Sequence, residues 1–228
     1  VLDVKVGSGA FMKDEPSARE LARTMVDIGQ DHGVRTVALL TDMEAPLGRR
    51  VGNALEVAEA VEVLSGGGPA DVVELTVALA REMLTAAGLT PGRDGVKDPA
   101  EALRDGSALA HWKDLVRAQG GDPDAPLPEA AERRVVSAPA SGTLTRLDAY
   151  RVGLAAWRLG AGRARKEDAV SFGAGVTLHA KPGEKVTAGE PLFTLYSDEP
   201  ECVERAEQAL EGAFDVGAAE GWTRRPLI

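Results

Sequence analysis

The sequence predicts an α/β fold, in which a parallel-sheet βαβ segment with flanking helices is followed by an α+β barrel-sandwich C-terminal domain. Two β-branched strand patterns, residues 1–6 and 36–41, flank a helical periodicity over 17–32, an order that pairs the strands in parallel through a right-handed crossover. After residue 135 the pattern changes to short strands separated by turns. We therefore expect an α/β part over 1–120, a Gly/Pro/Asp-rich linker over 121–134 and a second domain over 135–228.

Composition narrows the classes of function. The chain has 228 residues, a 44% hydrophobic content and a net charge of −10, which argues against a protein that binds nucleic-acid backbones. Cys202 is the single cysteine, so an internal disulfide is excluded. No apolar run approaches the roughly 20 residues of a membrane span, and no signal peptide is visible, which predicts a soluble, cytoplasmic protein without membrane contact. Because Val1 begins inside an apparent strand, we expect the chain to be part of a longer polypeptide.

The first strand runs into a glycine turn, Gly7-Ser8-Gly9. Such a turn invites a nucleotide-binding interpretation, but the full G-x-G-x-x-G spacing is absent, which favours glycines that only allow close backbone approach. The following helix tolerates Pro16 in its first turn and repeats apolar residues at Leu21, Met25 and Ile28, a helical spacing that continues until Gly33.

The stretch Thr41–Ala60 is the most informative part of the chain. It follows a continuous apolar run over 36–41, typical of a strand buried on both faces. A loop at 46–48 then interrupts regular structure, and Asn53 with Glu56 matches a capping box at the start of a helix. Open α/β sheets place ligands where a strand, a loop and a helix N-terminus meet in this order.

Helical periodicity then continues along the first part. Helices are expected over 53–64, 71–87, 99–104 and 106–118. The three glycines at 66–68 follow a helix and lack a Lys-Ser/Thr pair, so they predict a helix end rather than a phosphate loop.

The second part reads as strand-rich segments over 135–147 and 175–195, with helices over 152–159 and 201–214. Its second half resembles the barrel of biotinyl and lipoyl carrier domains. Leu195-Tyr-Ser-Asp-Glu-Pro200 stands where those carriers hold the modified lysine, so one alternative function is an interaction module without carrier chemistry.

Few side chains suit nucleophilic or transition-metal chemistry. None of the histidines, His32, His111 and His179, has a Ser, Cys or second His at a spacing that would indicate catalysis or metal binding, so structural roles are favoured for them. Oxygen ligands are better represented. Glu56 and Glu59 lie one turn apart on one helix, and the 46–50 loop must expose carbonyls that it cannot pair internally. This set suits a hard, weakly bound cation, while a capping box with a solvated acidic face is the alternative.

Four motifs carry a resemblance to a known family: VLDVKVGSGAFM at 1–12, TDMEAPLGRRVGNALEVAEAVEVLSG at 41–66, LGAGRARKED at 159–168 and GVTLH at 175–179. The chain resembles the thymidine phosphorylase and pyrimidine-nucleoside phosphorylase family over nearly its whole length. The resemblance implies a pentosyltransferase of nucleoside salvage, which uses phosphate as co-substrate to split pyrimidine (deoxy)nucleosides into base and (deoxy)ribose 1-phosphate. It also implies a homodimer.

The resemblance further implies site residues. A monovalent cation, usually potassium, would be held by the backbone carbonyls of Leu47 and Arg50 and by the Glu59 carboxylate, with Arg50 in place of a small residue. Phe11 would line the pyrimidine pocket, core packing being its alternative.

The family's phosphate-binding loop and base-holding residues lie upstream of the motif at 1–12, so no catalytic residue is expected in this segment and the segment alone is expected to be inactive. We expect its partner to be the N-terminal half of the same enzyme. A phosphoribosyltransferase relative is a further alternative, against which the domain after Val135 argues.

Overall fold

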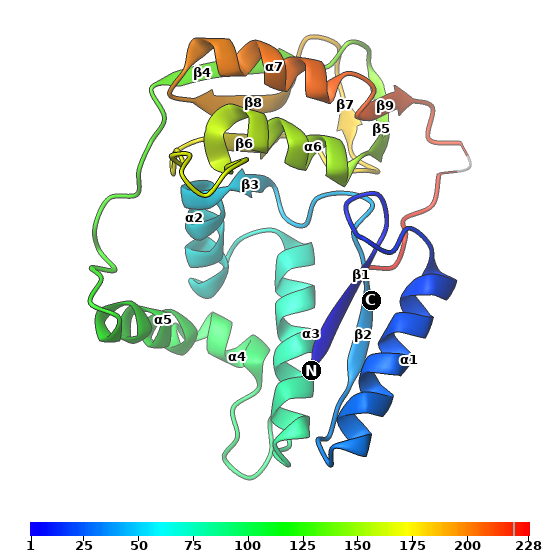
Figure 1. Cartoon of the computed structure of the whole chain (residues 1–228), viewed down its shortest axis with the longest axis vertical. Coiled ribbons are helices and arrows are strands. Elements are labelled where there is room, and N and C mark those ends of the chain that lie inside the picture. Colours follow the sequence, from blue (N-terminus) through cyan, green and yellow to red (C-terminus); the bar gives the residue numbers. More distant parts are fainter. Residues whose placement is uncertain (221) are drawn as a thin grey trace.

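The computed structural model describes residues 1–220 and 222–228, which form an α/β part and a mostly β part (Figure 1). The α/β part contains β1 (Leu2–Val6), α1 (Glu15–Asp31), β2 (Ala38–Asp42), β3 (Arg50–Gly52), α2 (Asn53–Leu64), α3 (Ala70–Ala86), α4 (Pro99–Arg104) and α5 (Ser107–Ala118). The mostly β part contains β4 (Glu132–Ser137), β5 (Gly142–Leu147), α6 (Ala149–Ala156), the π-helical turn η1 (Trp157–Ala161), β6 (Gly175–Leu178), β7 (Lys185–Val186), β8 (Pro191–Ser197), α7 (Pro200–Leu210) and β9 (Phe214–Gly217). The predicted mixed α/β class is confirmed.

The first three elements form the predicted parallel βαβ unit, in which β1 pairs with β2 and Val4 lies opposite Leu40. The expectation that the second strand is buried on both faces is wrong, because residues 38–40 are only half-buried. In the part of the chain that the structure describes, β2 has β1 as its single neighbouring strand, so one edge and part of a face lack cover.

Helix α1 begins where the Asp14 carboxylate accepts a hydrogen bond of 2.9 Å from the Ser17 amide. Its small residues Ala18 and Ala22 are buried against the strands, since a short side chain lets the helix approach the sheet closely. The apolar residues that indicate the helix are not its packing face, since Leu21 and Ile28 are exposed.

Helix α2 begins at the predicted residue, but the predicted capping box does not form. The Asn53 amide group donates to the Ala161 carbonyl at 2.7 Å, while the Glu56 carboxylate accepts from the Gly52 amide at 2.9 Å. Asn53 thus ties α2 to the second part of the chain instead of capping its own helix, and Gly52 takes the cap position.

The strands of the second part form two antiparallel sheets, β3-β6-β8-β4 and β7-β5-β9, and no closed barrel is present among the described residues. The strand β3 comes from the first part of the chain, so one sheet joins both parts. Helices α6 and α7 pack together over this core (Figure 1). Its largest fully buried side chains are Leu144, Leu147, Leu159, Leu178, Leu192, Phe193 and Leu195.

The carrier alternative loses its structural basis at the end of β8. This strand ends at Ser197 and the chain enters α7 at Pro200, so a helix start occupies the position where carriers present a lysine on a tight turn. Within residues 1–220 and 222–228, none of the helices combines the length and apolar character that crossing a bilayer requires.

Candidate functional site

The glycine turn after β1 lies against the end of β2. A Cβ atom on Gly7 would lie 2.5 Å from the Glu44 nitrogen and 2.7 Å from the Met43 carbonyl carbon. The φ angle of Gly7 is +133°, and the Gly9 amide donates to the Met43 carbonyl at 3.0 Å. These glycines therefore allow two backbone segments to touch, which supports the close-approach interpretation over the nucleotide-binding one.

This contact presents Phe11 to solvent. Ser8 is held by Glu44, whose carboxylate accepts from the Ser8 amide at 3.0 Å and whose carbonyl accepts from the Ser8 hydroxyl at 2.9 Å. The side chain of Phe11 is 99% exposed, so the core-packing alternative is wrong. An aromatic ring held out on an anchored loop is available to a ligand or to another polypeptide.

The carboxylate of Glu59 turns from α2 toward the 46–50 loop. Glu59 is only 6% exposed, and its two oxygens lie 2.9 and 3.2 Å from the Arg49 amide nitrogen. Glu56, one turn away on the same helix, is exposed and accepts from the Gly52 amide instead. The structure brings the Glu59 carboxylate to the loop that carries Leu47 and Arg50.

Burial raises the pKa of Glu59, while the amide of Arg49 and the guanidinium of Arg50 partly oppose that rise. The Arg50 guanidinium lies 3.4 Å from the Glu62 carboxylate, where it forms an ion pair on the outer face of α2. An open cleft of about 410 Å³ is lined by these charged groups. The carboxylate of Glu59 is thus a buried negative group with room for a compensating charge beside it.

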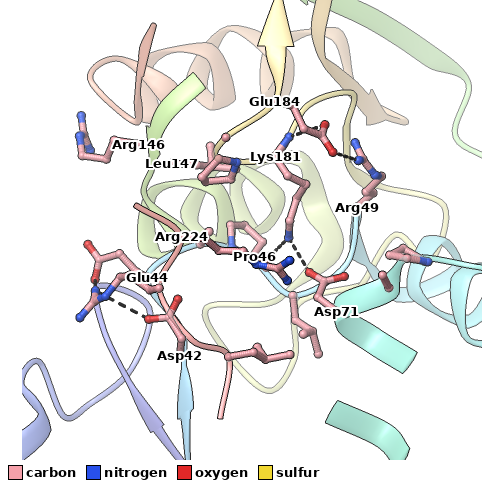
Figure 2. Close-up of a pocket in the computed structure, with 18 of the residues that line it drawn as sticks. Asp42, Glu44, Pro46, Arg49, Asp71, Arg146, Leu147, Lys181, Glu184 and Arg224 are labelled. Atoms are coloured by element: carbon pink, nitrogen blue, oxygen red, sulfur yellow. Dashed lines mark hydrogen bonds and ion pairs between the residues drawn. The ribbon is translucent and has the colours of Figure 1, made fainter. Parts of the chain in front are cut away.

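Most carbonyls of the loop are not free, contrary to expectation. The ammonium of Lys181 donates to the carbonyls of Pro46 and Gly48, the latter at 2.7 Å, and it lies 3.0 Å from the Asp71 carboxylate (Figure 2). The Arg49 carbonyl accepts from a β6 amide at 2.7 Å. Among the described residues, none donates a hydrogen bond to the Leu47 carbonyl.

Lys181 and Asp71 form a half-buried ion pair, in which each side chain is 17% exposed. Burial lowers the pKa of Lys181, although the Asp71 carboxylate opposes that change. Burial alone would raise the pKa of Asp71, but the Lys181 ammonium and the Gly48 amide outweigh it and hold that pKa below its usual value. Asp71 is therefore ionised at neutral pH, with its charge directed at the ammonium.

A cavity of about 920 Å³ lies between the two parts of the chain, and Figure 2 shows its walls. Residues 222–228, the C-terminal tail, form one wall, and the Asp42 amide donates to the Leu227 carbonyl at 2.9 Å. Its charged side chains pair with one another, as in the ion pairs of Arg49 with Glu184 and of Arg225 with Glu44. The cavity is therefore a junction between the parts whose walls combine ion pairs with apolar residues.

Two of the three histidines, His32 and His179, make local contacts of the kind that a structural role requires, whereas His111 is exposed. Nε2 of His179 lies 2.7 Å from the Thr194 hydroxyl, and burial lowers the pKa of this histidine, with Arg133 and Arg49 adding to the effect. Nδ1 of His32 lies 2.9 Å from the Ile28 carbonyl at the end of its own helix. In the described part of the chain, no group of three His, Cys, Asp or Glu side chains is placed to hold a metal ion.

The pair of Lys181 and Asp71 is absent from the sequence prediction. Lys181 and Pro46 are 135 residues apart, so no local pattern connects them. The available signal is the Lys-Pro-Gly turn at 181–183, whose glycine permits a reversal that points the lysine back across the junction.

Two family models match the chain. Residues 1–109 match the glycosyl transferase family a/b domain, and residues 143–217 match the pyrimidine nucleoside phosphorylase C-terminal domain. The second match argues against a phosphoribosyltransferase relative, which would resemble only the first part.

Curated relatives give the same picture. The chain is 59% identical over 228 residues to thymidine phosphorylase of Mycobacterium tuberculosis (strain ATCC 25618 / H37Rv). The aligned region covers 100% of this chain and 52% of the relative. It is 44% identical over 224 residues to pyrimidine-nucleoside phosphorylase of Geobacillus stearothermophilus, with 96% of this chain and 52% of the relative covered. For the pyrimidine-nucleoside phosphorylase of Bacillus subtilis (strain 168), the identity is 42% over 221 residues, with 94% of this chain and 50% of the relative covered. The chain thus spans about half the length of the curated relatives that it matches.

Proposed function

We propose that this chain, which belongs to the pyrimidine-nucleoside phosphorylase family and corresponds to the C-terminal half of its members, supplies one part of an enzyme for reversible phosphorolysis of pyrimidine (deoxy)nucleosides. The observation that carries the proposal is the 59% identity to a thymidine phosphorylase, which extends over all 228 residues. The resemblance brings phosphate as co-substrate and a homodimeric assembly into the same proposal.

Within this proposal, the chain has a supporting part in the reaction. Phosphorolysis requires phosphate placed against the anomeric carbon of the sugar and stabilisation of the base as it leaves with negative charge. Phe11, exposed on a loop that Glu44 anchors, would provide an apolar wall for the base. The groups that hold phosphate and polarise the base are expected from the preceding half of the relatives.

The proposal is tested with two proteins: the 228-residue chain alone, and a fusion in which it replaces the matching half of the Mycobacterium tuberculosis relative. We expect no phosphate-dependent release of thymine or uracil by the chain alone. The fusion is expected to turn over at the rate of an ordinary enzyme, on the order of 1–10³ per second.

Phe11→Ala in the fusion should raise KM for the nucleoside, because the ring would contact the base. Phe172→Ala is the matched control, since Phe172 is also exposed and has no proposed contact with substrate. Turnover by the isolated chain would contradict the assignment of catalytic groups to the preceding half. A folded fusion that is inactive on every pyrimidine nucleoside would contradict the proposed reaction.

We also propose that a monovalent cation binds between the Leu47 and Arg50 carbonyls and the Glu59 carboxylate. The donor set fits such an ion, because Glu59 is a buried carboxylate whose pKa is raised by burial and whose negative charge would be compensated by the cation. Arg50 does not occupy this position, since its guanidinium pairs with Glu62. The ion would tie the loop to α2 and supply positive charge; potassium is the ion that the family resemblance implies.

Thermal unfolding in potassium chloride and in tetramethylammonium chloride tests the cation site. A ligand at about 100 times its Kd stabilises the folded state by about 2.7 kcal/mol, and Glu59→Gln should remove most of this potassium-specific gain. Glu56→Gln is the matched control, because Glu56 only accepts from the Gly52 amide and its loss should cost about 1 kcal/mol or less. If Glu59→Gln retains the full potassium gain, the cation does not bind there.

A domain boundary within 121–134 completes the proposal. The two family matches end at residue 109 and begin at residue 143, and residues 121–131 contain no helix or strand. The strand β4 begins at Glu132, so the last three residues of the expected linker belong to the second domain.

A further inference from the structure

We propose that Lys181 is a positioning residue, whose ammonium fixes the Pro46–Gly48 loop in the conformation that lets Leu47, Arg50 and Glu59 share a cation. The inference rests on the proposed cation site and deepens it, because it assigns control of that site to a residue of the other domain. Lys181 lies on the turn after β6, whereas the loop lies between β2 and β3 of the α/β part.

The ammonium has a complete set of partners. A lysine side chain carries three N–H donors, and those of Lys181 are matched by the carbonyls of Pro46 and Gly48 and by the Asp71 carboxylate. The Asp71 carboxylate also accepts from the Gly48 amide at 3.1 Å. Gly48 is thus held at its carbonyl by Lys181 and at its amide by Asp71.

Gly48 lies between this ion pair and Glu59. A Cβ atom on Gly48 would overlap a carboxylate oxygen of Glu59 and would lie 2.9 Å from the Glu59 Cδ atom. The φ angle of Gly48 is +67°, so the chain reverses at this residue. Gly48 therefore contacts the Lys181 ammonium through its carbonyl and lies directly against the Glu59 carboxylate at its Cα. A shift of the ammonium would move a peptide that touches Glu59.

The turn that carries Lys181 is itself fixed to the loop. The Glu184 carboxylate accepts from the Lys181 amide at 3.0 Å and pairs with the Arg49 guanidinium, as Figure 2 shows. The Arg49 guanidinium also donates to the His179 carbonyl at 3.2 Å. Movement between the two domains would therefore reach the cation site through Lys181.

Hydrogen exchange of backbone amides in potassium-free buffer tests the positioning directly. Lys181→Met should speed exchange of the Arg49 amide, which donates to Glu59, and of the Leu178 amide, which donates to the Arg49 carbonyl. We expect an acceleration of about tenfold or more at both amides, because local opening of the loop becomes easier. Amides of the βαβ unit should keep their protection, which shows that the variant is folded.

Lys185→Met is the matched control, because Lys185 is exposed on β7 of the same turn region and is expected to leave exchange unchanged. Lys181→Arg keeps a positive charge at the site and should retain part of the protection. It also decides the question if Lys181→Met fails to fold: acceleration of less than about tenfold at both amides supports a role for the positive charge, whereas acceleration of about tenfold or more contradicts it.

The potassium-specific shift in melting temperature tests the link to the cation. We expect Lys181→Met to lose that shift, while Lys185→Met keeps it. Unchanged exchange at Arg49 and Leu178 would overturn the positioning role, and fast exchange with an undiminished potassium shift would overturn its link to the site. If the original chain shows no potassium shift, the cation site is wrong, and exchange still decides whether Lys181 positions the loop.

Discussion

Replacing Phe193 with alanine is expected to lower the free energy of unfolding by about 3–5 kcal/mol. Phe193 lies on β8, is 0% exposed, and its ring centroid lies 5.4 Å from that of Phe214 at an interplanar angle of 58°. Since β8 and β9 belong to different sheets, this aromatic pair joins the two sheets of the second domain. Alanine would leave a cavity at that junction and remove the contacts of both rings.

Urea unfolding followed by tryptophan fluorescence measures this loss. Phe11→Ala is the matched control, because Phe11 is 99% exposed and surface substitutions change stability by about 0.5 kcal/mol or less. The pair of variants separates two roles of one residue type: Phe193 stabilises the fold, whereas Phe11 is expected to act in substrate binding. A loss below 1 kcal/mol for Phe193→Ala, the lower end for disruptive core changes, would show that the two sheets are not joined as described.

Local patterns predicted the elements whose stability comes from their own sequence. The bounds of α2 and α4 coincide with the predicted ones, those of α3 are shifted by one residue at both ends, and those of α5 differ by one residue at its start. These helices have clear apolar periodicity and are ended by glycine or capped by aspartate, signals that operate within one turn of the chain. The parallel pairing of β1 and β2 was predictable because the crossover rule leaves one arrangement.

Elements that depend on distant partners were not predictable in this way. The strand β3 has three residues and β9 has four, too few to show a periodic pattern, and each is defined by its pairing with β6 or β5. The two sheets replace the expected barrel for the same reason, since closure depends on strand order. Asn53 illustrates the limit of capping rules, because its side chain finds the Ala161 carbonyl in place of its own helix.

The candidate site likewise combines a local contact that the sequence predicts with a long-range contact that it does not. Glu59 could be predicted to face the loop, since a helix start and a carbonyl-rich loop lie close together in the sequence. The Lys181 ammonium could not, because it comes from the other domain and the carbonyls that it binds lie 135 and 133 residues away in the sequence. Lys181 binds the Pro46 and Gly48 carbonyls, so the proposed ligands Leu47 and Arg50 are not among the carbonyls that it takes.

Gly175→Ala is expected to disrupt the strand pairing that joins the two domains. Gly175 begins β6, lies opposite Gly52 of β3, and has a φ angle of +154°, which side chains rarely adopt. A Cβ atom there would overlap the Val51 carbonyl oxygen and lie 2.8 Å from the Leu55 Cδ1 atom. Because a backbone carbonyl cannot move without breaking the ladder, we expect a loss of about 3 kcal/mol in unfolding free energy.

Gly153→Ala is the matched control for that variant. Gly153 lies within α6, and a Cβ atom there would have no neighbour within 4 Å, so alanine should stabilise the chain by about 0.4–1 kcal/mol. The two variants add the same methyl group with opposite expected effects. Since β3 directly follows the 46–49 loop, Gly175→Ala should also reduce the potassium-specific stabilisation, whereas Gly153→Ala should leave it intact. Equal urea midpoints for the two variants would mean that β3 does not lie against β6 as described, and that the cation loop is held by the Lys181 ammonium without the strand beside it.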